Sequence, residues 1–200
     1  MAVTSNIKSF LNTVQQGVKS NLFLCEFQFP SELGSEAPTL DTVNMLCKSA
    51  ALPASNLGVI EVPFRGRTVK IAGDRTFDTW TVTVINDRNF EIRHGFERWM
   101  EAMNRHEGNT AAQWIPDESN TGFLKDLTVK QLERDSTDEG SVLRTYTLVG
   151  AFPTNVSQID VAYDSNDQIE DFTVEFQLQY WTANTGNAQL ASEASQGQIN

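Results

Sequence analysis

Few side chains in this chain combine the residue types and the spacing that catalysis or metal binding requires. His94 and His106 are the only histidines, and no cysteine or carboxylate accompanies them at the spacing of a zinc site. The run from Asp164 to Asp167 resembles the start of a calcium loop, but the sixth-position glycine and the closing bidentate glutamate are missing. No nucleophile elbow, phosphate-binding loop or dinucleotide-binding motif is present. The sequence therefore predicts no catalytic residue, no cofactor and no metal site.

The acidic residues are unevenly distributed along the chain, whose net charge is −11. No Lys or Arg follows Arg144, whereas seven acidic residues do: Asp160, Asp164, Asp167, Glu170, Asp171, Glu175 and Glu193. This argues against a basic nucleic-acid-binding surface in that part of the chain. Two interpretations stay open, a solvated face that aids solubility or a surface that repels DNA.

A second charged cluster has mixed signs and surrounds a predicted turn at Gly73-Asp74. Its members are Arg65, Arg67, Lys70, Asp74, Arg75 and Asp78. On a monomer such a cluster is an ordinary surface. At a contact between subunits, the same charges would set register and orientation more than affinity.

Most of the elements that position these residues read as strands. The apolar alternation and turn residues predict strands at Leu22–Phe29, Val43–Ser49, Val62–Ile71 (interrupted by Gly66), Thr76–Ile85, Leu127–Arg134, Val142–Val149, Ile159–Tyr163 and Phe172–Tyr180. Pro30–Asp41 reads as a loop. We expect a mainly β fold, an antiparallel β-sandwich or barrel, with one flanking α-helix at about residues 88–104 and a short N-terminal helix or arm. Residues 1–181 form a single domain in this interpretation, and residues 182–200 form a flexible tail.

The expected core comes from one face of each element. Ile92, Phe96, Trp99, Met100 and Met103 follow the helical period, after a cap at Asn86 or Asp87. On the strands, Trp80 and Phe176 lie on apolar faces, and the last strand places Phe172, Val174, Phe176, Leu178 and Tyr180 inward. We predict that Trp80, Phe96, Trp99 and Phe176 are buried.

Two strands carry a polar row opposite their apolar face. One row is Thr79, Thr81 and Thr83, and the other is Thr173, Glu175, Gln177 and Gln179. A sheet with one apolar and one polar face turns the polar one toward water.

The chain has no apolar run near the ~20 residues of a membrane helix and no signal-peptide h-region at its start. We expect a protein that is soluble, not exported by a cleaved signal and not inserted in a membrane. Cys25 and Cys47 are the only cysteines. A disulfide between them is one option, and buried free thiols are the favoured one.

Four sequence segments, in this order along the chain, resemble the tail tube proteins of contractile-tailed bacteriophages. They are NLF (Asn21–Phe23), CKSAALPAS (Cys47–Ser55), GRTVKIAGDRTFDTWTVTVINDRNFEIRHGFERW (Gly66–Trp99) and FPTNVSQIDVAYDSNDQIEDFTVEFQLQYW (Phe152–Trp181). The AGDRTFDTWTVTVINDRNFEIR and FPTNV pieces are the specific ones. The Pro30–Asp41 loop and the 182–200 tail are longer than this family leads us to expect.

The resemblance implies a structural virion protein and not an enzyme. It implies hexameric rings that stack into a hollow tube inside the contractile sheath, assembled in the host cytoplasm, through which DNA is ejected. The implied partners are other copies of the chain, the tail sheath protein, and baseplate and tube-terminating proteins. DNA would pass without specific binding.

The resemblance also suggests roles for the two polar features. Arg65, Arg67, Lys70, Asp74 and Arg75 become candidates for a subunit or ring interface. The rows Thr79, Thr81, Thr83 and Thr173, Glu175, Gln177, Gln179 become candidates for the lumen wall, with bulk solvent or another subunit as the alternative.

Three other functions stay open for this sequence. The first is the inner tube of a tailocin or type VI-like injection machine, which would share the fold and differ in cargo. The second is a monomeric β-barrel binding module, which would need an apolar interior pocket. The third is an enzyme, which would need turnover dependent on His94 or a carboxylate.

Overall fold

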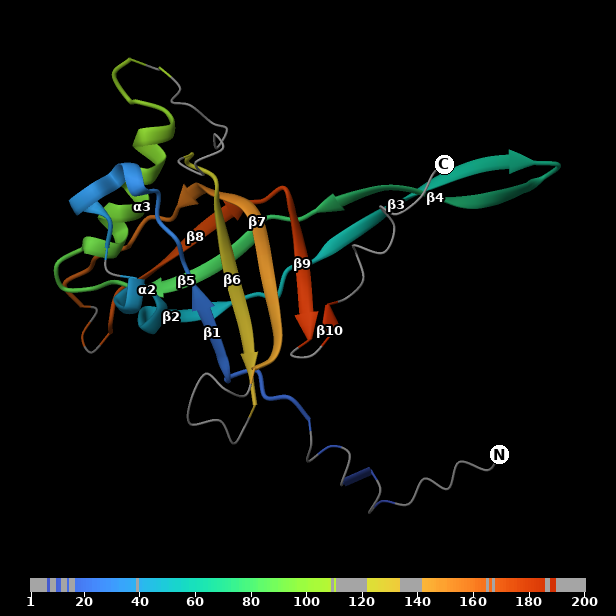
Figure 1. Ribbon diagram of the computed structural model, residues 1–200, viewed down its shortest axis with the longest axis horizontal. Coiled ribbons are helices and arrows are strands. Elements are labelled where there is room, and N and C mark those ends of the chain that lie inside the picture. The colour runs from blue at the N-terminus through green and yellow to red at the C-terminus, as the bar shows by residue number, and fades with distance from the viewer. Residues whose placement is uncertain are drawn as a thin grey trace.

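The computed structural model describes residues 7, 10, 11, 14, 17–38, 40–108, 110, 122–133, 142–164, 166, 168–185 and 188–189. Antiparallel strands dominate it (Figure 1), which confirms the predicted fold class. The strands are β1 (Phe23–Glu26), β2 (Cys47–Ala50), β3 (Ser55–Phe64), β4 (Arg67–Phe77), β5 (Trp80–Ile85), β6 (Lys125–Leu132), β7 (Val142–Val156), β8 (Asp171–Gln177), β9 (Tyr180–Thr185) and β10 (Ala188–Gln189). The helices are the 3-10 helix η1 (Ser31–Glu36), α2 (Leu40–Leu46) and α3 (Glu91–Met103).

Strand β7 organises the body of the molecule. The main sheet has the order β1-β6-β7-β8-β5-β2, and β9 also pairs with β7. The first part of β7 pairs with β6 and β9, whereas its last part pairs with β8. Gly150, with φ 61°, lies at the change, and the register shifts again between Pro153 and Asn155. The sheet therefore bends, so that β6, β7 and β9 run in a different direction from β5 and β8 (Figure 1).

The core inside this bend is aromatic. The Phe176 ring lies 5.5 Å from Trp80, 5.8 Å from Phe96 and 6.2 Å from Trp99, measured between centroids. All four side chains are at most 2% exposed, so the predicted core is confirmed. Each indole N–H has a partner, since Trp80 donates to the Ala51 carbonyl at 2.7 Å and Trp99 donates to the Phe123 carbonyl at 2.9 Å.

Helix α3 matches the predicted flanking helix. Its buried residues are Ile92, Gly95, Phe96, Trp99 and Met103, while Met100 is partly buried. The Asp87 carboxylate accepts hydrogen bonds from the backbone N–H groups of Glu91 and Ile92, both at 3.1 Å. The N-cap residue itself is Phe90, with φ 58°, so the expected aspartate satisfies the first N–H groups of the helix from three residues before the cap position.

Two predicted strands are wrong. Most of Val43–Ser49 is the helix α2, because a short apolar alternation does not distinguish a strand from one buried helix turn. Val43 is fully buried there, and the Asn44 side-chain oxygen accepts a hydrogen bond from the Phe27 N–H at 3.1 Å. The segment Ile159–Tyr163 is irregular, because no described strand pairs with it, and Val161 is 79% exposed. The expected loop Pro30–Asp41 contains η1 and the start of α2.

The chain also departs from prediction after β8. The inward alternation ends at Leu178, because the strand breaks there and β9 then pairs with β7. Tyr180, predicted inward, is 47% exposed. Strand β9 crosses the expected domain boundary at 181 and reaches Thr185, whereas residues 190–200 lie outside the described residues.

The expected N-terminal helix lies mostly outside the described residues. Four of its apolar residues, Ile7, Phe10, Leu11 and Val14, are described; they have helical backbone and are exposed. None of the helices in the described part of the chain is long and apolar enough to cross a membrane.

Candidate assembly surface

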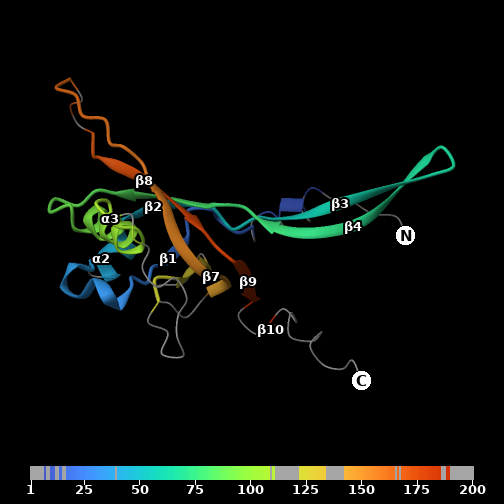
Figure 2. The same ribbon diagram turned by 90° about the horizontal axis from the view of Figure 1, so that it is seen from above.

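The β3–β4 ribbon extends far from the body, on the side opposite α2 and α3 (Figures 1 and 2). Within the described residues, these two strands pair only with each other. Arg65 and Gly66 form the tip with φ values of 43° and 79°. Positive φ at both central residues is typical of the two-residue turn that suits the twist of a hairpin. A two-stranded ribbon is marginally stable by itself in water, so this one needs support.

The predicted turn at Gly73-Asp74 is wrong, because both residues lie within β4. A register shift in the ribbon lies between Leu57 and Val59, beside this position. A Cβ atom on Gly73 would come within 3.2 Å of the Gly58 backbone. The two glycines therefore allow the strands to approach closely at a bulge. Glycine within a strand often marks such a bulge, just as it often marks a turn between strands.

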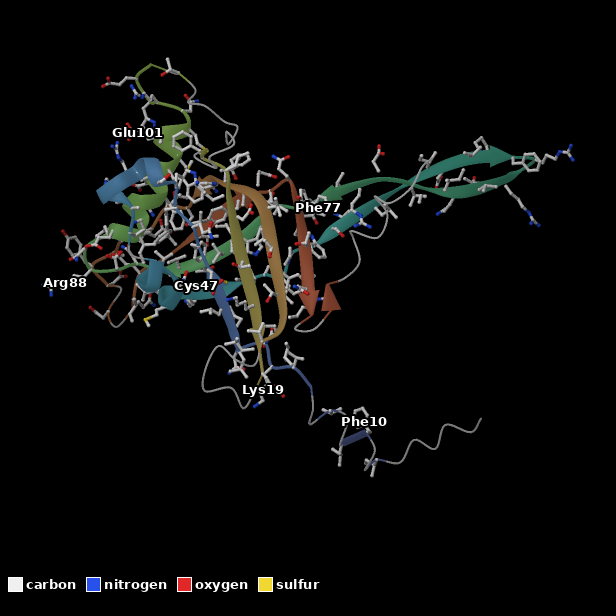
Figure 3. The ribbon with its side chains drawn as sticks, viewed as in Figure 1. Phe10, Lys19, Cys47, Phe77, Arg88 and Glu101 are labelled. Carbon is white, nitrogen blue, oxygen red and sulfur yellow. The ribbon has the colours of Figure 1, made fainter. Side chains whose placement is uncertain are left out.

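Side-chain contacts hold the root of the ribbon. Asn56 donates from its amide nitrogen to both carboxylate oxygens of Asp78, at 2.8 and 2.9 Å. Trp181 donates to the Ala54 carbonyl at 3.0 Å and packs its ring 6.5 Å from that of Phe77. Phe77 marks the place where β4 enters the body (Figure 3). The ribbon is thus anchored at one end and projects at the other.

One face of the ribbon is apolar and uncovered. Directly paired residues share a face, so Ile60 with Ile71 and Val62 with Val69 form a continuous apolar strip, which Phe64 extends toward the tip. Their exposed fractions are 53%, 53%, 43%, 49% and 63%, in that order. Exposed apolar area of this kind marks an interaction surface.

The opposite face carries one charged pair between the uncharged pairs Val59–Ala72 and Pro63–Thr68, and the tip is basic. Glu61 and Lys70 pair across the strands and form an ion pair of 3.4 Å. Between residues 55 and 77 the basic residues are Arg65, Arg67, Lys70 and Arg75, and the acidic ones are Glu61 and Asp74. The ribbon is therefore cationic in a chain of net charge −11. Such a separation of charge favours contact with the acidic part of another copy. The five predicted interface residues run from the tip along β4.

The two predicted polar rows lie side by side on the body. Thr81 pairs with Glu175, and Thr83 pairs with Thr173, so β5 and β8 combine their rows on one face. Gln177 donates to the Thr79 hydroxyl at 3.0 Å. The other face of the same strands holds the buried aromatic core. Gln179 follows the end of β8, where its N–H donates to the Val149 carbonyl at 3.1 Å, so it does not continue the row.

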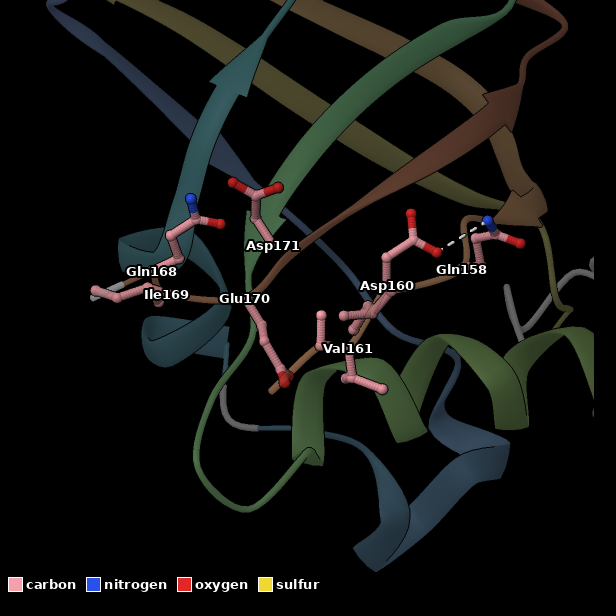
Figure 4. Close-up of a pocket in the computed structure, with 9 residues that line it drawn as sticks. Gln158, Asp160, Val161, Gln168, Ile169, Glu170 and Asp171 are labelled. Carbon is pink, nitrogen blue, oxygen red and sulfur yellow. Dashed lines mark hydrogen bonds between the residues drawn. The ribbon is translucent and has the colours of Figure 1, made fainter. Parts of the chain in front are cut away.

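One cavity in the described part of the chain is lined by carboxylates. An acidic pocket between residues 158–162 and 168–171 is lined by Asp160, Glu170 and Asp171 (Figure 4). Asp160 accepts a hydrogen bond from Gln158 at 3.2 Å, and Asp171 pairs with Lys48. Within the described residues, no group of three or more His, Cys, Asp or Glu could hold a metal ion.

Sequence comparison assigns the family. The family of phage tail tube proteins matches residues 18–184, which is most of the chain. The chain belongs to the phage tail tube protein family. The predicted resemblance is thereby confirmed, and the uncovered ribbon is a feature of a tail tube subunit.

Individual relatives agree. This tail tube protein is 38% identical to tail tube protein gp19 of Enterobacteria phage T4 over 135 residues, which is 68% of this chain and 78% of that protein. It is 34% identical to the tail tube protein of Serratia phage KSP90 over 155 residues, which is 78% of this chain and 81% of that protein.

Solved structures share the fold. A chain of the anti-feeding prophage baseplate superposes with a TM-score of 0.58 at 16% identity, over 86% of this chain and 97% of that one. A chain of the anti-feeding prophage tube-terminating cap superposes with a TM-score of 0.56 at 20% identity, over 92% and 99%.

Sequence reasoning missed the ribbon as a separate unit. The sequence suggested a strand interrupted at Gly66, followed by a turn at Gly73-Asp74. The available signal was Arg65-Gly66 between two runs of β-branched residues, which fits a hairpin tip better than an interruption.

Proposed function

We propose that this tail tube protein forms hexameric rings, which stack into the hollow tube of a contractile phage tail. The observation that carries the proposal is the β3–β4 ribbon, whose apolar strip is exposed and is covered by none of the described residues of the single chain. A second copy would cover it. A head-to-tail contact of this kind closes into a ring or continues as a filament, according to its geometry.

The tube acts as a conduit and not as an enzyme in this proposal. DNA passes along a lumen lined by the β5 and β8 polar rows, in which Glu175 is the one charged residue. A wall without basic residues neutralises no phosphates, so DNA is not retained in transit.

The remaining partners follow from the assembly. Tail sheath protein would cover the outside of the tube, and baseplate and tube-terminating proteins would cap its two ends. The protein would assemble in the host cytoplasm, become part of the virion and never insert in a membrane.

A matched pair of variants tests the assembly. Val69 and Thr68 are neighbours on β4, and their side chains lie on opposite faces of the ribbon. We expect Val69→Asp to stay unassembled and Thr68→Asp to form tubes, as measured by analytical ultracentrifugation and negative-stain microscopy. Both variants should keep the melting temperature of the wild-type monomer, since the ribbon lies outside the core. Normal tubes from Val69→Asp would refute a role for the strip.

The fold likeness to anti-feeding prophage chains keeps the inner tube of an injection machine as a second candidate. The two candidates, a phage tail tube and the inner tube of an injection machine, differ in the cargo that passes through the tube. Particles purified from the source of this chain should contain DNA if the tube serves a phage, and only protein if it serves an injection machine.

A further inference from the structure

The two cysteines lie on the two edge strands of the main sheet. Strands β1 and β2 are the first and last in the order β1-β6-β7-β8-β5-β2, and no backbone ladder joins them in the described part of the chain. Cys25 lies on β1 and is 1% exposed, while Cys47 begins β2 and packs partly buried against the same core. The two cysteines belong to the same core cluster, and each thiol shifts the pKa of the other.

Neighbouring contacts hold this arrangement in place. The N–H of Phe27, two residues after Cys25, donates to the side chain of Asn44 at 3.1 Å, three residues before Cys47. The Cys47 sulfur also lies 3.9 Å from the Ser49 carbonyl oxygen. The Phe27–Asn44 hydrogen bond joins the segment after Cys25 to the helix before Cys47, so it holds the backbones that carry the two cysteines near each other.

We propose that Cys25 and Cys47 form a redox modification site, at which a small-molecule disulfide converts the two thiols into one intramolecular disulfide that joins the edge strands β1 and β2. This inference is independent of tube formation, because both cysteines and their contacts belong to one chain.

The reaction has two exchange steps. The Cys47 thiol loses its proton, and its sulfur attacks one sulfur of the oxidant; a mixed disulfide forms, and one small thiolate leaves and takes up a proton. The Cys25 sulfur then loses its proton and attacks the Cys47 sulfur, which releases the second small thiol. The protein loses two electrons and two protons, and the oxidant is reduced to two thiols.

The surroundings decide which cysteine reacts first. Cys47 is the more exposed of the two, so an oxidant reaches it more easily. The hydrogen bond from Cys25 lowers the pKa of Cys47, whereas that hydrogen bond and burial raise the pKa of Cys25. Since the thiolate is the nucleophile, Cys47 attacks the oxidant and Cys25 completes the disulfide.

Oxidation of the full chain by bis(2-hydroxyethyl) disulfide tests the site. This oxidant is uncharged, so the net charge of −11 does not repel it. We expect the protein to lose both free thiols and two hydrogen atoms in mass, with no adduct retained. A non-reducing digest should link the peptides that carry Cys25 and Cys47. The melting temperature should rise by about 5–10 °C, because the bond restricts the unfolded chain.

Single variants separate the two steps. Cys25→Ser should retain a stable mixed disulfide on Cys47, and Cys47→Ser should stay unmodified while folded, because Cys25 is buried. If Cys25→Ser does not fold, the peptide linkage in the wild-type chain decides the question. A wild-type chain that keeps both thiols, stops at an adduct, links between molecules or melts lower after oxidation would overturn the proposal.

Discussion

At the scale of single residues, Trp99 joins the helix to the strands. Its ring lies 5.6 Å from that of Phe29 and 6.2 Å from that of Phe176, and its side chain is fully buried. We expect Trp99→Ala to lower the free energy of unfolding by about 3–5 kcal/mol, through lost burial and a cavity. Urea unfolding of the monomer measures this. Tyr163→Ala, at a fully exposed residue, is the control and should change it little.

Gly95 is a second residue whose identity follows from packing. A Cβ atom at this position of α3 would lie 2.5 Å from Cδ of Pro38. We expect Gly95→Ala to destabilise the fold by about 1–3 kcal/mol, because overpacking outweighs the better helix propensity of alanine. Chemical denaturation of Gly95→Ala, Pro38→Ala and the double variant provides the measurement. The double variant should be more stable than Gly95→Ala; if it is not, the Pro38 contact is not the cause.

The burial of most core residues could be predicted from sequence because each lies on one face of a regular element. The helical period selected Phe96 and Trp99, and the strand alternation selected Trp80 and Phe176. Tyr180 shows the limit of that reasoning. Its position follows from a change of pairing partner at the end of β8, which no local period records.

At the scale of elements, the ribbon has a cationic tip. Arg65 stacks over the Phe64 ring, with its guanidinium carbon 5.5 Å from the centroid, and Arg67 is exposed on the next strand. Long-range attraction between this tip and an acidic chain raises the rate of encounter at low salt.

Reversing a tip charge should therefore slow assembly. We expect Arg67→Glu to form tubes at a lower rate and with a weaker dependence on salt, while the melting temperature of the monomer stays the same. Light scattering at several ionic strengths measures the rate. Arg88→Glu, on the exposed turn before α3 (Figure 3), is the matched control. Equal rates for both variants would place the tip outside the contact.

Whether an element exists was easier to predict than what it contacts. The long periodic segments α3, β5 and β8 could be identified because every residue repeats the pattern. The short segment that became α2 could not, since its seven residues are too few to distinguish a helical period from a strand alternation. The ribbon strands were recognised in part, but the point at which they leave the body is marked by the contacts of Asn56 and Trp181, which join positions far apart in the chain.

At the scale of the whole molecule, the charge of the β5–β8 face decides how the proposed lumen treats DNA. We expect Thr81→Lys combined with Glu175→Lys to assemble normally and to slow DNA ejection, because each new cation that neutralises a phosphate strengthens binding. Real-time ejection from particles carrying the variant measures this, and added salt should restore the rate. Thr81→Ser with Glu175→Gln is the control. Unchanged ejection would place this face away from the DNA.

The family and the fold class could be predicted from the sequence because the order of the family's sequence segments and the alternation of the strands are properties of one chain. The faces that meet in a tube are a property of several chains. Thr81 and Thr173 could be assigned to a water-facing side, but alternation does not distinguish a lumen from bulk solvent. The uncovered strip on β3 and β4 became evident only once the ribbon was seen apart from the body.

The isolation of the ribbon gives it a separate stability. Its backbone hydrogen bonds lie outside the aromatic core, so they can open locally without unfolding the rest of the chain. In the single subunit, amide protons of residues 59–72 should exchange with deuterium much faster than those of β5 and β8. Burial of the strip in an assembled tube should slow that exchange toward the rate of the core. The ribbon would then report, residue by residue, on whether a subunit has been incorporated.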